Sequence, residues 1–132
     1  MRAALLAVGL VLAVWSAPLA SADPVAPPEV PDVEGVLFTD DPSIVDPRQM
    51  PIESWSRVGD DRAVAVHFTT GTPACNGVHA TTRETADTVT ISLSGGSVPA
   101  SAGRMCILIA MTGTLEVPLQ GPLDDRQVLS AS

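Results

Sequence analysis

From Pro51 onward, apolar and polar residues alternate in short runs, which is the pattern of pleated strands with one buried face. The clearest run covers residues 88–93, where Val89, Ile91 and Leu93 alternate with threonine and serine. The same pattern predicts further strands over residues 52–58, 63–70, 78–83, 115–117 and 126–130. Residues typical of turns separate these runs. We therefore expect an all-β domain, either a small antiparallel β-sandwich of immunoglobulin-like architecture or a flattened barrel, with about seven strands.

One segment departs from this alternation. Residues 105–111 are apolar at every position, which is typical of a central strand that is covered on both faces. Gly113 follows shortly afterwards and predicts a bend or a bulge.

The chain before Pro51 is rich in proline and acidic residues. Because proline denies a backbone donor, residues 23–50 are expected to form an acidic N-terminal arm. Residues 23–32 would be a flexible extended lead, and the apolar residues around Phe38 would dock on the body. Residues 51–132 would then form the β-domain, with one disulfide.

Residues 1–22 have the pattern of a secretory signal peptide. Arg2 supplies a positive start, residues 3–14 form an apolar run, and a small-residue motif predicts cleavage between Ala22 and Asp23. The apolar run is shorter than the roughly 20 residues of a membrane span, so no transmembrane segment is expected after cleavage. The prediction is a secreted protein, extracellular or associated with the cell wall.

Charge narrows the range of partners. The whole chain has a formal net charge of −8, and loss of Arg2 with the leader leaves −9. Most of this charge falls in residues 23–61. Nucleic acid and anionic lipid would be repelled, so the expected partner is a protein or another component of the cell envelope.

Cys75 and Cys106 are the only cysteines. An even count in an exported chain favours a disulfide over a metal site or a nucleophile. A bridge across this separation would contribute roughly 3 to 4 kcal/mol to stability in the chain-entropy model.

Two features are candidates for metal binding. If residues 63–83 form a hairpin, His67 and His79 lie opposite each other and are candidates for holding a metal ion, although no metal site is predicted. A third ligand cannot be placed, so solvated strand histidines are the simpler interpretation. The tripeptides Asp60-Asp61-Arg62 and Asp124-Asp125-Arg126 repeat before two predicted strands, and turn chemistry explains them better than calcium binding.

No complete catalytic set is recognisable. Ser94 and Ser97 flank two glycines without forming a nucleophile elbow, and the acids Glu84, Asp87 and Glu116 lack an evident substrate cleft. No catalytic residue and no cofactor are therefore predicted. The favoured function is a non-catalytic binding or structural module. The alternative is a small extracellular metal-binding protein or hydrolase that uses His67 and His79.

The body also resembles a group of small exported actinobacterial proteins of unknown function. The residues that carry the resemblance are Trp55, Asp61-Arg62, Cys75, Glu84-Thr85, Val89-Thr90-Ile91, Cys106 and the closing stretch from Pro122 to Val128. The closing stretch differs from the group's motif at Asp124, where the group has glycine. The resemblance covers residues 51–130 and implies the single disulfide and the β fold, but no activity.

Overall fold

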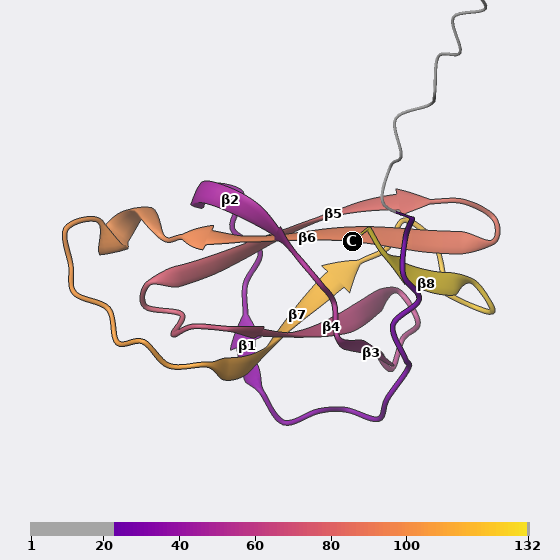
Figure 1. Ribbon diagram of the computed structural model, residues 1–132. Helices are drawn as coiled ribbons and strands as arrows, with labels where there is room; N and C mark the ends of the chain where they lie inside the picture. The colour runs from indigo at the N-terminus through magenta and orange to yellow at the C-terminus, as the bar shows by residue number, and fades with distance from the viewer. Residues whose placement is uncertain (1–22, 132) are drawn as a thin grey trace, which may run out of the picture.

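The computed structural model describes residues 23–131, which form two four-stranded β-sheets lying one above the other (Figure 1). The strands are β1 (Val36–Phe38), β2 (Val45–Met50), β3 (Ser54–Arg57), β4 (Ala63–Thr70), β5 (Asn76–Glu84), β6 (Thr88–Ser97), β7 (Met111–Pro118) and β8 (Gln127–Ser130), with one short 3-10 turn, η1 (Pro99–Ser101). Sheet A has the order β2-β6-β5, and β8 also pairs with β6. Sheet B has the order β1-β7-β4-β3.

The predicted all-β fold is confirmed, and the two open sheets correspond to a sandwich and not to a closed barrel. The sheets are mixed, however, because β1 runs parallel to β7 and β8 runs parallel to β6. Within residues 23–131, no helix has the length and apolarity to cross a bilayer. The predicted signal peptide and the residue before its cleavage site lie outside the described residues.

The core lies between the sheets and follows the predicted alternation. Val89, Ile91 and Leu93 of β6 are almost completely buried, as are Phe68 of β4 and Leu115 of β7 in the facing sheet. The rings of Phe38 and Phe68 pack edge to face, with their centroids 5.6 Å apart.

Gly113 makes this ring packing possible. A Cβ atom at this position would lie 2.5 Å from Cε2 of Phe68 and 2.9 Å from Cε2 of Phe38, which is too close for a real contact. The β4–β7 register runs through Gly113 without interruption, so the predicted bend or bulge is absent. The glycine is needed for the close approach of two aromatic rings to the strand.

Residues 23–50 contribute one strand to each sheet, an arrangement that differs from the expected arm. β1 pairs with β7 and β2 pairs with β6, and the side chains of Phe38 and Ile44 are buried. The expected flexible lead is also attached, because the backbone of Val25 exchanges two hydrogen bonds with Ser130. Pro47 is accommodated because β2 is an edge strand whose register shifts between Val45 and Arg48.

Residues 29–35, the crossing segment, connect the two edges of sheet B. They begin at a bridge between Glu29 and Trp55 of β3 and end where β1 joins β7 at the opposite edge. The chain therefore passes across the outer face of sheet B, and Figure 1 shows it running below this sheet towards β1. The crossing segment covers polar side chains on the outer face of sheet B, which the alternation of apolar and polar residues along the strands assigns to solvent.

The prediction of a central strand over residues 105–111 is wrong. β7 begins only at Met111, and residues 105–110 form a loop between η1 and β7. The ladder between β4 and β7 starts at the pair Thr70–Met111, so β4 offers no partner to the residues before Met111. We call residues 105–110 the apolar loop.

Candidate functional site

The two histidines are far apart in the fold. His67 lies in β4 of sheet B and His79 in β5 of sheet A, because these strands pair with other neighbours and form no hairpin. The premise of the candidate metal pair is therefore wrong. Among the described residues, no cluster of three or more His, Cys, Asp or Glu side chains has the arrangement of a metal site.

His67 is part of a buried polar cluster beneath the crossing segment. Its Nε2 lies 2.7 Å from Ser56 Oγ, and its Nδ1 lies 2.9 Å from Thr114 Oγ1. The Ser56 hydroxyl donates to the carbonyl oxygen of Pro31 in the crossing segment, at 3.2 Å. Sequence reasoning missed Ser56 and Thr114, although strand alternation places both on the same face as His67.

For a neutral imidazole, one arrangement of protons satisfies all three contacts of this cluster. Because Ser56 gives its single proton to Pro31, it accepts from Nε2–H of His67, and Nδ1 accepts from the Thr114 hydroxyl. A catalytic serine needs a base that is ready to take its proton, whereas in this arrangement the ring nitrogen that faces Ser56 carries a proton. The cluster therefore attaches the crossing segment to sheet B and does not form a nucleophile–base pair.

Burial lowers the pKa of His67 below its ordinary value of 6.5, and the nearby Asp32 carboxylate opposes this only in part. Above that value the ring is neutral in both the folded and the unfolded chain. Below it, the unfolded chain binds a proton that the folded state resists, so we expect the free energy of unfolding to fall as the pH drops from about 7.5 to about 5.5. Urea unfolding at both pH values measures this loss.

The control is the other histidine. His67→Asn is expected to remove most of the pH dependence, whereas His79→Asn leaves the contribution of His67 intact. An unchanged pH dependence in His67→Asn would contradict the assignment of a buried neutral imidazole.

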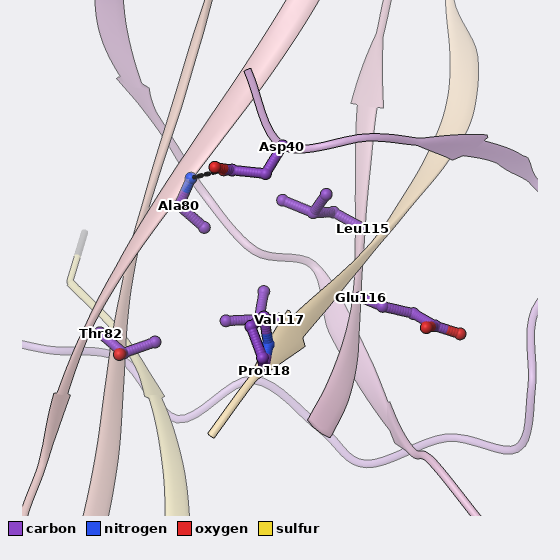
Figure 2. A pocket seen from close by; sticks show the side chains of 7 residues that line it. All are labelled: Asp40, Ala80, Thr82, Leu115, Glu116, Val117 and Pro118. Carbon is purple, nitrogen blue, oxygen red and sulfur yellow. Dashed lines mark hydrogen bonds between the residues drawn. The ribbon is translucent and has the colours of Figure 1, made fainter. Parts of the chain in front are cut away.

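His79 forms a more exposed contact on sheet A. Its Nδ1 lies 3.0 Å from Asp40 Oδ1, and the same carboxylate oxygen accepts the backbone N–H of Ala80 at 2.8 Å. A cavity of about 190 Å³ lies beside Asp40, between β5 and β7, and Figure 2 shows the side chains around it. Small-molecule sites usually measure about 300–1,000 Å³, so this opening at the margin of the core gives no basis for assigning a ligand.

The two Asp-Asp-Arg tripeptides lie next to each other. Asp61 Oδ2 accepts the backbone N–H of Asp124 at 2.9 Å, and Arg57 contacts both turns. Asp61 and Asp124 each adopt a positive φ, a conformation that aspartate tolerates in turns. The arrangement agrees with turn chemistry. The sequence alone did not indicate that the two turns pair.

Glu84, one of the acids considered for glycoside chemistry, is held in a structural contact. Glu84 is nearly buried and binds Arg126 Nη1 at 3.0 Å and the backbone N–H of Gln120 at 2.8 Å. Arg126 also donates to the carbonyl oxygens of Gly121 and Pro122. Both oxygens of Glu84 are thus used to hold the β7–β8 connection against β5.

The predicted disulfide is present and joins the apolar loop to the sandwich. Cys106 in the loop is bonded to Cys75, the residue that precedes β5, and their Cα atoms lie 6.1 Å apart. Beyond this tether the loop is turned to solvent: Met105 is 100% exposed, Leu108 99% and Ile107 65%. A hollow of about 540 Å³ separates the loop from the turn between β4 and β5.

The stretch of chain that contains the apolar loop carries almost no charge. Between Thr88 and Leu115 the only charged residue is Arg104, although the chain as a whole is strongly acidic. Exposed apolar side chains grouped on one loop are unusual for a monomeric protein and typical of a contact surface.

Comparisons of this chain with protein-family models, with curated proteins and with solved structures find no match, so its sites are interpreted from its own residues.

Proposed function

We propose that this protein is a secreted or envelope-associated, non-catalytic binding module whose contact surface is the apolar loop. The observation that carries the proposal is the exposure of Met105, Ile107 and Leu108 on a loop that a disulfide holds against the sandwich. A tethered loop loses less conformational freedom when it binds, so more of its contact energy appears as affinity.

Two features of the chain support the proposed export. Residues 1–22 have the composition of a signal peptide, and a disulfide persists in oxidising compartments outside the cytoplasm. These features support export, and they leave the choice between the medium and the cell wall to a fractionation experiment.

The loop favours a protein partner over a lipid surface. Residues 105–110 form no backbone-to-backbone hydrogen bond with any other described residue. The hydrocarbon of a bilayer cannot satisfy such backbone groups, whereas a protein strand can. The acidic chain is also repelled by anionic headgroups.

Leu108→Asp tests the proposal, with Leu37→Asp as the matched control. Both leucines are exposed, but Leu37 lies on β1, outside residues 105–110. Partners captured from the cell envelope by the wild-type protein are identified, purified and titrated against all three proteins. We expect Leu108→Asp to weaken binding about 30-fold, as for a central apolar contact, and Leu37→Asp to leave it unchanged. Equal affinities would remove the loop from the contact surface.

A further inference from the structure

The middle of the crossing segment is attached to sheet B at a single point. Val30 donates its backbone N–H to β3 at 2.8 Å, and β1 begins at Val36. Between them, residues 31–34 form no backbone-to-backbone hydrogen bond with any other described residue. Within the described chain, the hydrogen bond from the Ser56 hydroxyl to the carbonyl oxygen of Pro31 is the only one that reaches them. We call residues 31–34 the flap.

The flap covers the ring of His67, and the two hydroxyl groups that contact the ring lie at its two ends. Ser56 binds Pro31 at the start of the flap. Directly after its end, a Cβ atom on Gly35 would lie only 3.2 Å from Thr114 Oγ1. His67 is only 2% exposed, although it lies on the outer face of sheet B. Opening the flap would therefore bring water to the imidazole without separating the two sheets.

The closed cluster accommodates one ring proton. Nε2–H faces Ser56, and Nδ1 accepts the hydroxyl proton of Thr114. Within the described residues, Thr114 Oγ1 makes no other hydrogen bond. A second ring proton on Nδ1 would break this contact and would place a full charge where water has no access. A charged imidazole is therefore accommodated better when the flap is open.

The charged groups around the ring do not compensate for the missing water. Burial lowers the pKa of His67, and the Asp32 carboxylate of the flap opposes this only in part. Arg57 of β3 is paired with Glu29, at 2.9 Å. β4 contributes no other charged residue. The remaining charged residues on or next to the surrounding elements are exposed carboxylates, which are Glu34 of the flap, Glu53 before β3 and Glu116 of β7.

From this geometry we propose that the flap is a pH-dependent cover on sheet B, which opens when His67 takes up a proton and closes when the proton leaves. The hinges are Val30, which stays bonded to β3, and Val36, where β1 begins. A hollow of about 410 Å³ lies between the start of the flap and β3 and leaves room for the movement. The open state uncovers the imidazolium and its two hydroxyl partners. This inference does not rest on the proposed function, because the flap is separate from the apolar loop.

The direction and size of the effect follow from proton binding. In the open state the exposed ring titrates near its ordinary pKa of 6.5, whereas the closed state resists the proton. The open state is therefore favoured as the pH falls below that value. With the closed ring neutral throughout, the ratio of open to closed flaps rises about tenfold between about pH 7.5 and about pH 5.5.

Limited proteolysis with a glutamate-specific protease tests this proposal, because Glu34 lies in the flap and slow cleavage follows the population of the open state. Cleavage after Glu34 is measured by mass spectrometry at the two pH values. Each rate is divided by the rate for a synthetic peptide of residues 30–40, which corrects for the pH dependence of the protease. We expect the normalised rate of the wild-type protein to be about tenfold higher at the lower pH. Cleavage after Glu84, which is nearly buried in β5, reports global unfolding and should stay far slower.

Three variants separate the ring from the flap, and circular dichroism confirms that each is folded. His67→Asn cannot take up the proton, so its normalised rate should be the same at both pH values. Ser56→Ala removes the bond to Pro31 and should raise the rate at both. Ser54→Ala, on the same face of β3, leaves that bond in place and should behave like the wild-type protein.

The wild-type comparison of the two pH values needs no variant, so the proposal can be judged even where a substitution prevents folding. A normalised rate at Glu34 that does not change with pH would overturn the flap. So would a pH dependence that persists in His67→Asn, or a rise that Glu84 matches.

Discussion

A chain that begins at Pro51 instead of Asp23 is expected to lose its cooperative unfolding transition. Such a chain lacks β1 and β2, one strand from each sheet, together with the buried side chains of Phe38 and Ile44. Removing one buried phenylalanine side chain typically costs about 3–5 kcal/mol, and a small domain has only about 5–15 kcal/mol of stability. The loss of two strands and the crossing segment therefore exceeds what the remaining sheets provide.

Near-ultraviolet circular dichroism and urea unfolding measure this outcome. A chain that begins at Val25 is the matched control, because Val25 is the first described residue with a backbone hydrogen bond to the sandwich. We expect this shorter truncation to unfold like the chain that begins at Asp23. A Pro51 chain with a cooperative transition would show instead that residues 23–50 are a separable arm.

Replacing both Cys75 and Cys106 with serine is expected to lower the free energy of unfolding by roughly 3 to 4 kcal/mol, because the bridge restricts a loop of about 30 residues in the unfolded chain. Cys106 is exposed and serine is close to cysteine in size at the buried Cys75, so most of the loss should come from the missing bond. Urea unfolding of the double variant and of wild-type protein gives the difference.

Reduction of the wild-type protein should reproduce this destabilisation without any change of side chain. Hydrogen exchange should also increase in residues 98–104, whose backbone hydrogen bonds lie next to the bridge, before it increases in β4 and β6. A loss below about 1 kcal/mol would mean that the bridge adds little to the stability of the fold.

The strands of residues 52–130 were predictable because each carries its own two-residue period. Val89, Ile91 and Leu93 face the core as their alternation requires, and the pairing of Cys75 with Cys106 followed from their number and the predicted export. β2 was not predicted, because Asp46 and Pro47 within it oppose strand formation. Both lie where the register of this edge strand shifts, so no ladder hydrogen bond of a central strand is lost.

The errors share one physical origin, which is that burial depends on neighbours that are distant in sequence. Alternation placed His67 on the outer face of sheet B correctly, but it could not reveal that the crossing segment covers this face. For the apolar loop the prediction was wrong in the opposite sense, because residues expected to be buried are exposed. Residues 105–110 have the composition of a buried strand, yet β4 is already paired with residues 111–118 and leaves them exposed.

The free energy of unfolding of Leu108→Asp, measured in dilute protein, tests most directly whether the apolar loop is a surface and not part of the core. Because Leu108 is 99% exposed, we expect a change within about 0.5 kcal/mol of the wild-type value. A loss of several kcal/mol would place Leu108 inside the sandwich, and the contact surface proposed for this protein would then not exist.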